Sequence, residues 1–226
     1  MPGAKAIVFA ADGAGNFQAA SQSLRKTVRD DALPIEVVTF DWSHGNNRII
    51  ADQTDYCWAR EKGRALADMI EDYKRDHPKT PIYLVGHSAG AMVAIAAVED
   101  LPPGTIAKAI LLAPSLSSQY DLRPALARVA ESIEVFYSRR DVPYLVCALR
   151  LFGTTDGKPL PAGGLVGFVS RVESEEDIVL NGKLHQRPWV PDDMRAGHTG
   201  GHYGAYAPNF LRWNVLPLIR ASGQKS

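Results

Sequence analysis

The chain has 226 residues, with 25 basic and 25 acidic side chains and 46% hydrophobic residues. This length allows one substantial core, and we expect a single domain over residues 1–226. A formal net charge of zero argues against nucleic-acid binding, which usually requires a basic surplus or a basic stripe. No apolar run approaches the ~20 residues of a membrane-spanning helix, so we expect no membrane span and a cytoplasmic protein.

Short aliphatic runs alternate along the chain with longer segments of helical periodicity. This alternation is typical of a mainly parallel sheet covered by helices on both faces. We therefore predict an α/β fold, a three-layer α/β/α sandwich with a mostly parallel sheet. Residues 153–167 and 188–204 are rich in glycine and proline and are expected to form long loops. In chain order, the predicted elements are strand 5–10, helix 17–30, strand 36–40, helix 58–76, strand 82–85, helix 89–100, strand 107–112, helix 123–130, strand 133–137, helix 143–152, a strand around 177–184 and helix 208–220.

The two cysteines, Cys57 and Cys147, each lie within a segment of helical pattern. A disulfide between them is one interpretation. Two buried, reduced thiols are the interpretation that we favour, because disulfides are rare in cytoplasmic proteins and unpaired cysteines are often buried.

The most informative segment is Gly86-His87-Ser88-Ala89-Gly90, a G-x-S-x-G sequence between an apolar run and a run of small residues. A tight turn from strand to helix lifts the serine hydroxyl clear of the backbone, and the flanking glycines leave room for this crowded geometry. The helix N-terminus supplies N–H groups and partial positive charge where an oxyanion develops. The pattern predicts Ser88 as a nucleophile and the N–H of Ala89 as one oxyanion donor. The alternative is a plain glycine-rich turn.

In this context the segment resembles the nucleophile turn of the α/β-hydrolase family. The resemblance implies the chain order nucleophile, acid, histidine. The acid is expected after a later strand, and Asp141 follows the predicted strand 133–137 in an Asp-Val-Pro sequence that is similar to the family's. A carboxylate there fixes the histidine tautomer and stabilises the imidazolium ion. An alternative role for Asp141 is to cap a helix that starts at Pro143, and Asp156 is the reserve candidate for the acid.

The family histidine is expected in a late loop, where the chain has both His198 and His202. His202 is favoured because it lies closer to the final predicted helix. Two histidines also suggest zinc binding, but the Thr-Gly-Gly sequence between them is not helical and cannot place both rings on one helix face. We therefore expect no metal site. His185 is expected to pack or to lie on the surface.

The second oxyanion donor is expected in the loop after the first strand, where the resemblance assigns the N–H of Ala14. Relatives commonly have a His-Gly sequence in this loop, whereas this chain has Asp12 before the glycine. The same loop also resembles a dinucleotide-binding G-x-G-x-x-G sequence, with Asp41 as a ribose-binding acid. That alternative leaves the G-x-S-x-G segment, Asp141 and His202 without a role, and we disfavour it.

The segments 40–45 and 137–141 are also similar to those of several uncharacterised α/β-hydrolases without a separate lid domain. The resemblance implies a serine hydrolase that cleaves a small-molecule carboxylic ester and needs no cofactor. Trp42, Tyr56 and Trp189 are expected to line the acyl or alcohol pocket. Thioesterase, lipase-type and acyltransferase activities on the same three residues are alternatives, and so is a non-catalytic relative that only binds a ligand.

Overall fold

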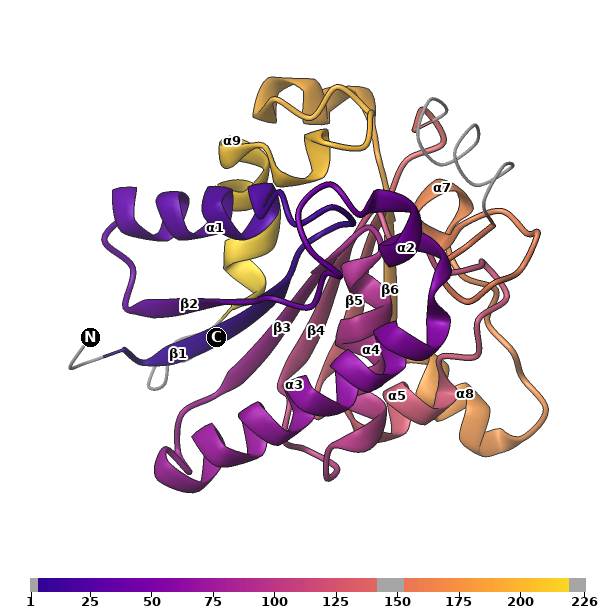
Figure 1. Ribbon diagram of the computed structural model, residues 1–226, viewed down its shortest axis with the longest axis horizontal. Coiled ribbons are helices and arrows are strands. Elements are labelled where there is room, and N and C mark those ends of the chain that lie inside the picture. The colour runs from indigo at the N-terminus through magenta and orange to yellow at the C-terminus, as the bar shows by residue number, and fades with distance from the viewer. Residues whose placement is uncertain (1–3, 142–152, 220–226) are drawn as a thin grey trace.

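The structure, a computed structural model, describes residues 4–141 and 153–219. Within these ranges, six strands form one sheet in the order β2-β1-β3-β4-β5-β6 (Figure 1). All neighbouring strands are parallel, so the predicted α/β/α fold is confirmed and the sheet is wholly parallel here. The strands are β1 (Ala6–Ala11), β2 (Ile35–Phe40), β3 (Ile82–His87), β4 (Lys108–Leu112), β5 (Ser132–Tyr137) and β6 (Leu184–Pro188).

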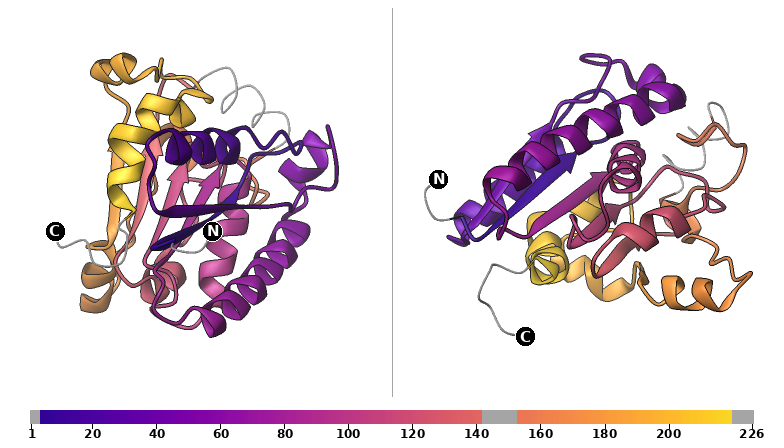
Figure 2. Two further views of the ribbon diagram at one scale, coloured as in Figure 1. Left: turned by 90° about the vertical axis from the view of Figure 1, so that its left-hand side faces the viewer. Right: turned by 90° about the horizontal axis from the view of Figure 1, so that it is seen from below.

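Helices cover both faces of the sheet (Figures 1 and 2). The helices α3, α4 and α5 pack on one face, and α1 packs on the other together with the helical segment that begins with α9. Both interfaces are mainly apolar, which explains why the central strands read as continuous apolar runs. The helices are α1 (Ala19–Asp30), α2 (Ile49–Thr54), α3 (Tyr56–Asp76), α4 (Gly90–Asp100), α5 (Arg123–Arg128), α7 (Gly163–Val166), α8 (Glu175–Asn181) and α9 (Pro208–Phe210), with short turns η2 (Pro191–Ala196), η3 (Gly204–Tyr206), η4 (Leu211–Val215) and η5 (Leu216–Leu218).

Helix α4 lies at the centre of this arrangement, and its residues from Gly90 to Val98 are all buried. Its small side chains allow α3 to approach closely. A Cβ atom at Gly63 of α3 would lie 2.3 Å from the Cβ atom of Ala96. This close contact holds the helix that follows the nucleophile turn firmly against the sheet.

The strand predicted around residues 177–184 is wrong. Residues 175–181 form the helix α8, and the strand β6 begins only at Leu184. The hydroxyl of Ser174 accepts a hydrogen bond from the N–H of Asp177, whose carboxylate accepts one from the N–H of Ser174. This reciprocal cap favours a helix, whereas the run Asp-Ile-Val-Leu had suggested a strand.

Some further expectations need correction, and others fall outside the described residues. The short helix α2 was not predicted, and α7 interrupts the expected loop 153–167. Cys57 is exposed on α3, so the prediction of a buried thiol is wrong for this residue. Cys147 and the predicted helix 143–152 lie outside the described residues.

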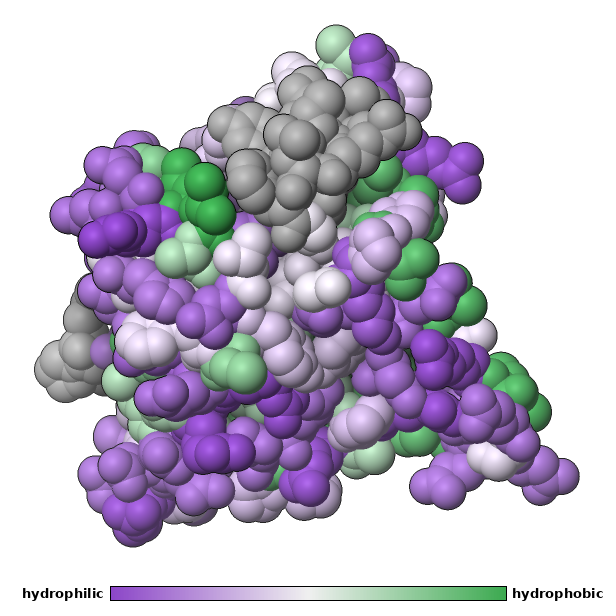
Figure 3. All heavy atoms as spheres, turned by 45° about the vertical axis from the view of Figure 1, so that its right-hand side comes forward, coloured by the Kyte–Doolittle hydropathy of each residue, from purple (hydrophilic) through white to green (hydrophobic). Residues whose placement is uncertain are grey.

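The molecular face drawn in Figure 3 is mostly hydrophilic, with small and separate hydrophobic patches. No helix in the described ranges is long and apolar enough to cross a membrane.

The parallel arrangement brings the carboxyl ends of all six strands to one edge of the sheet, which is where ligands bind in open α/β sheets. The loops that leave this edge carry Ser88 after β3 and Asp141 after β5.

Candidate active site

Ser88 occupies a sharp turn between β3 and α4. Its φ angle of 52° lies in the left-handed region, which a residue with a side chain rarely adopts. Both glycines of the motif are needed for close backbone contacts. A Cβ atom would lie 2.6 Å from the Cα atom of Ala91 at Gly86, and 2.2 Å from the carbonyl oxygen of Ala11 at Gly90. The G-x-S-x-G sequence therefore forms the strained turn that its spacing predicts, and not a plain surface turn.

Asp141 and His202 form a buried pair at the same edge of the sheet. The Nδ1 atom of His202 lies 2.7 Å from Oδ2 of Asp141, and both side chains are buried. A carboxylate at Nδ1 favours the tautomer with its proton there, which leaves Nε2 to act as a base. The structure thus brings the two predicted residues together although they are 61 positions apart in the sequence.

His198 lies in a different environment. Its Nδ1 atom accepts a hydrogen bond from the N–H of Gly200, and its ring packs edge-on against Phe210 at 4.7 Å. Burial lowers the pKa of His198 to about 4, so the ring is neutral near pH 7. These contacts give His198 a packing role between α9 and the loop 197–203, here called the histidine loop.

Asp156, the reserve candidate for the acid, and His185 both have other partners. Asp156 accepts hydrogen bonds from the N–H and the hydroxyl of Ser117, at 2.7 Å and 2.6 Å. His185 is half-exposed on the edge strand β6 and pairs with Glu134, as expected for a surface residue.

Asp12 points away from Ser88. Its carboxylate accepts hydrogen bonds from the N–H groups of Ala20 and Ser21, at 2.7 Å and 3.0 Å, in the first turn of α1. Burial raises the pKa of Asp12, while these hydrogen bonds oppose the shift. Asp12 therefore holds the start of α1, and it is also one of the residues that line the cavity beside Ser88.

The loop after β1 passes directly over Ser88. A Cβ atom at Gly13 would lie 3.2 Å from the Cβ atom of Ser88 and 3.0 Å from Nδ1 of His87. Within the described chain, neither the N–H of Ala14 nor that of Ala89 donates a hydrogen bond to a backbone carbonyl. The N–H of Ala89 adjoins Ser88, and the N–H of Ala14 lies on the loop above Ser88. Both positions suit donors to an oxyanion.

Sequence reasoning did not identify Asp52, which fastens this loop from α2. Its buried carboxylate accepts hydrogen bonds from the N–H of Gly15 at 2.8 Å, the hydroxyl of Ser43 at 2.6 Å and the N–H of His44 at 2.8 Å. The ring of His44 also contacts Asp52 and stacks on Trp58. Three donors from two loops thus converge on one carboxylate. No sequence motif indicates such a contact, because the partners come from different segments.

His87, the residue before Ser88, was also not assigned a role. Its ring is buried, lies 4.9 Å from the ring of His202 and meets Tyr206 edge-on at 5.0 Å. Burial lowers the pKa of His87 well below its usual value, and the neighbouring His202 lowers it further. His87 is therefore a neutral ring that supports one face of His202.

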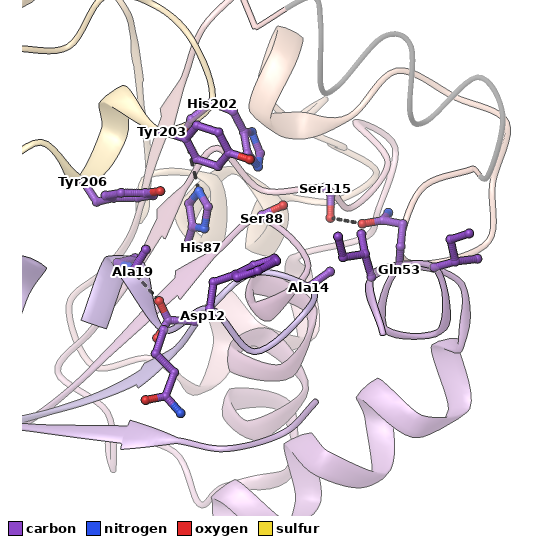
Figure 4. A pocket seen from close by; sticks show the side chains of 16 residues that line it. Asp12, Ala14, Ala19, Gln53, His87, Ser88, Ser115, His202, Tyr203 and Tyr206 are labelled. Atoms are coloured by element: carbon purple, nitrogen blue, oxygen red, sulfur yellow. Dashed lines mark hydrogen bonds between the residues drawn. The ribbon is translucent and has the colours of Figure 1, made fainter. Parts of the chain in front are cut away.

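Ser88 and His202 line the same cavity, which has a volume of about 260 Å³ (Figure 4). Its wall comes mainly from the loop after β1, from α2 and from the histidine loop. Apolar side chains predominate, including those of Phe17, Ile49 and Ile50. The full set of described lining residues is Asp12, Gly13, Ala14, Phe17, Gln18, Ala19, Ala20, Ile49, Ile50, Gln53, His87, Ser88, Ser115, His202, Tyr203 and Tyr206.

The three aromatic residues expected in the pocket are not among these lining residues. Trp42 is buried and donates a hydrogen bond from Nε1 to the carbonyl of Asp12 at 2.8 Å, so it supports the loop from behind. Tyr56 begins α3 and is partly exposed. Trp189 donates to the carbonyl of His198 at 2.7 Å and packs beneath Arg140.

Comparison with known proteins agrees with this architecture. Residues 7–218 match the alpha/beta hydrolase family. Similar solved structures include a lipase-esterase related protein from Clostridium acetobutylicum, with a TM-score of 0.52 and 12% identity over 91% of this chain and 90% of that one. An esterase from Pyrococcus furiosus has a TM-score of 0.53 and 13% identity, over 93% and 83% of the two chains. A predicted CIB-like hydrolase from Thermoplasma acidophilum has a TM-score of 0.54 and 14% identity, over 96% and 88%.

At identities this low, the likeness to these solved structures shows only that the folds are similar. No curated protein matches the sequence. The family match, in contrast, spans nearly the whole chain. It includes the strand β3, the turn at Ser88 and the loop 197–203 that carries His198 and His202. The chain belongs to the α/β hydrolase family.

Proposed function

We propose that this protein is a single-domain serine hydrolase that cleaves carboxylic esters through a covalent acyl-enzyme. Ser88 is the nucleophile, His202 the general base and Asp141 the residue that orients the base. The observation that carries the proposal is the buried pair of Asp141 and His202, 2.7 Å apart, beside a cavity that His202 shares with the strained Ser88.

In the proposed first step, Ser88 Oγ attacks the ester carbonyl while its proton moves to Nε2 of His202. Asp141 accepts the Nδ1–H hydrogen bond and stabilises the imidazolium ion that forms. The tetrahedral intermediate then expels the alcohol, which takes the proton from Nε2. A water molecule next gives a proton to Nε2 and attacks the acyl-enzyme, which releases the acid and restores the hydroxyl of Ser88.

The N–H groups of Ala89 and Ala14 are the proposed donors to the oxyanion. Ala89 adjoins the N-terminus of α4, where the helix dipole favours negative charge. Ala14 lies on the loop that Gly13 brings against Ser88. Removal of one such donor in other hydrolases costs roughly 10²–10³ in rate. Protein groups and water are sufficient for the whole cycle, so the proposal includes no cofactor.

A fluorophosphonate probe tests the nucleophile directly. We expect the wild-type protein to gain one adduct by intact-mass spectrometry, and peptide mapping to place that adduct on Ser88. Ser88→Ala should abolish labelling, whereas Ser117→Ala, a change at a buried serine outside the cavity, should retain it. A wild-type protein that stays unlabelled, or a label that persists in Ser88→Ala, contradicts the proposal.

A further inference from the structure

The cavity beside Ser88 has one polar end in an otherwise mainly apolar wall. Gln53 and Ser115 line it, and Thr155 lies directly behind them. All three side chains are buried, and Ser115 is only 1% exposed. Buried polar groups are costly unless they are hydrogen-bonded. Polar side chains at this place, in the wall of the cavity beside Ser88, can bind a polar group of a ligand.

The hydrogen bonds of this cluster use all the side-chain protons of Gln53 and Ser115. Nε2 of Gln53 lies 3.3 Å from the carbonyl of Gly153, which only accepts, so the amide nitrogen must face that way. Nε2 also donates to Oγ1 of Thr155 at 3.3 Å, and Oε1 of Gln53 accepts from Ser115 Oγ at 3.3 Å. The one hydroxyl proton of Ser115 is directed either to Oε1 of Gln53 or to Oγ1 of Thr155, which lies 2.6 Å from Oγ of Ser115.

These hydrogen bonds leave the two residues that line the cavity with acceptors but no donors. In either arrangement Gln53 and Ser115 have no side-chain proton left for a ligand, while Oγ of Ser115 and Oε1 of Gln53 each keep a lone pair. A ligand group with a proton to donate complements these atoms, whereas a carbonyl or a carboxylate does not. A hydroxyl group is the simplest partner of this kind.

The polar end lies beside the nucleophile, on the side away from the base. The N–H of Ser115 donates to the carbonyl of Ser88 at 3.1 Å, which fixes the two serines next to each other. Figure 4 shows Ser115 and Gln53 to one side of Ser88, with the ring of His202 on the side of Tyr203. The leaving alcohol must meet His202 to receive its proton, so the opposite side is available to the acyl group.

The remaining wall restricts the acyl group further. Phe17, Ile49 and Ile50 offer only apolar surface. Among the described lining residues the one carboxylate is that of Asp12, and there is no lysine or arginine. A neutral chain therefore fits better than an anionic one. The volume of about 260 Å³ lies below the ~300–1,000 Å³ of sites for drug-sized ligands, which favours a short chain.

From this arrangement we infer that the preferred substrates are esters of short, hydroxylated acyl groups, with Ser115 and Gln53 accepting a hydrogen bond from a hydroxyl close to the scissile carbonyl. This inference rests on the proposed esterase function and specifies its substrate class. It makes Ser115 and Gln53 specificity-determining residues, with Thr155 holding the hydroxyl of Ser115 in the required orientation.

A matched set of ethyl esters tests the inference: butyrate, 2-hydroxybutyrate, 3-hydroxybutyrate and 3-oxobutyrate. Each kcat/KM is divided by the rate of alkaline hydrolysis of the same ester, which removes differences in intrinsic reactivity. We expect one hydroxybutyrate to exceed butyrate by on the order of tenfold, the discrimination that one neutral hydrogen bond provides. The 3-oxobutyrate, which has an acceptor in place of the donor, should show no such advantage.

Two variants test whether the preference for hydroxylated esters comes from Ser115 and Gln53. Ser115→Ala and Gln53→Leu should each reduce the ratio of hydroxylated to plain ester to less than about twofold. Ser118→Ala, a change at a buried serine of the same loop outside the cavity, should leave the ratio unchanged. Equal turnover of butyrate and both hydroxybutyrates by the wild type overturns the inference and leaves the esterase proposal standing. A hydroxyl preference that survives in both variants also overturns it.

Binding to Ser88→Ala separates the two proposals. This variant retains the polar end, and saturation-transfer NMR with the same esters compares their affinities without turnover. If the wild type hydrolyses none of the esters but Ser88→Ala prefers a hydroxybutyrate, the subsite is supported and the esterase proposal fails. If Ser88→Ala shows no preference between the esters, the subsite is overturned regardless of activity.

Discussion

The hydroxyl of Ser138 donates a hydrogen bond to the carbonyl of Gly200 at 2.6 Å. Ser138 lies three residues before Asp141, and Gly200 lies two residues before His202. This one contact therefore joins the loop that carries Asp141 to the loop that carries His202. Both groups are buried at the contact. The distance between Asp141 and His202 depends on two loops from different strands, and this hydrogen bond helps to fix their separation.

Ser138→Ala should therefore lower kcat more than it raises KM. Loss of the contact lets the acid and histidine loops shift, and a misplacement of about 1 Å can cost up to 10²-fold in rate. We expect kcat to fall about tenfold and the free energy of unfolding to fall by about 1–2 kcal/mol. Ser117→Ala is the matched control, because its hydroxyl also makes a 2.6 Å hydrogen bond in a buried position. Equal loss of kcat in both variants would assign the effect to general destabilisation.

Asp12→Ala should destabilise the protein by about 1–2 kcal/mol, measured by urea unfolding. The carboxylate satisfies two N–H groups at the start of α1, and loss of such a cap typically costs this amount. Asp12→Asn retains an acceptor oxygen and should keep most of the stability. If both variants lose the same stability, the charge of Asp12 matters and its role as an acceptor does not explain the effect.

The fold could be predicted from the sequence because its central elements follow local rules. The apolar run before Ser88 and the small residues after it specify a buried strand and a buried helix. The prediction failed at the sheet edge, where β6 reads Leu-His-Gln-Arg-Pro. An edge strand is partly exposed and lacks the apolar run by which buried strands are recognised. The neighbouring Ile178 and Val179 suggested a strand but lie exposed on α8.

The candidate site was predictable only where family order or a local motif applies. Ser88, Asp141 and His202 follow that order, and the structure brings Asp141 and His202 into contact. The cavity wall was not predictable, because Phe17 and Gln53 reach the site through tertiary contacts of the loop after β1 and of the unpredicted α2. The aromatic residues Trp42, Tyr56 and Trp189 were expected there instead, and they are not among the described residues that line the cavity.

Gly90→Ala should destabilise the protein by about 3 kcal/mol or more and abolish ester hydrolysis. The added Cβ atom would lie 2.2 Å from the carbonyl of Ala11 and 2.3 Å from that of Asp12, so β1 or the loop above Ser88 must move. For stability, Gly201→Ala is the control, since a Cβ atom there meets nothing within 4 Å. Thermal unfolding compares the two variants. A stable Gly90→Ala protein would show that the backbone contact is not required.

Acidification should destabilise the protein in part through His198. Burial lowers its folded-state pKa from 6.5 to about 4, so between these values the unfolded chain binds a proton that the folded protein does not. Stability is therefore complete above pH 6.5 and falls as the pH decreases toward 4. At pH 4.5 the loss from this residue is about 2–3 kcal/mol.

His198→Asn tests this dependence, because asparagine can accept the hydrogen bond from Gly200 but does not titrate. The difference in unfolding free energy between pH 7 and pH 4.5 should be smaller in this variant than in the wild type by about 2 kcal/mol. An unchanged pH dependence in His198→Asn would show that His198 does not titrate in this range.

The most direct test of the central claim is the hydrolysis of p-nitrophenyl esters of graded acyl length by four proteins: wild type, Ser88→Ala, His202→Ala and His198→Ala. We predict that the wild type is active, that Ser88→Ala and His202→Ala each lose at least about 10³-fold in kcat/KM, and that His198→Ala keeps most of its activity once its stability is taken into account. Activity that survives in Ser88→Ala or His202→Ala, or that disappears only in a folded His198→Ala, contradicts the assignment of Ser88, His202 and Asp141.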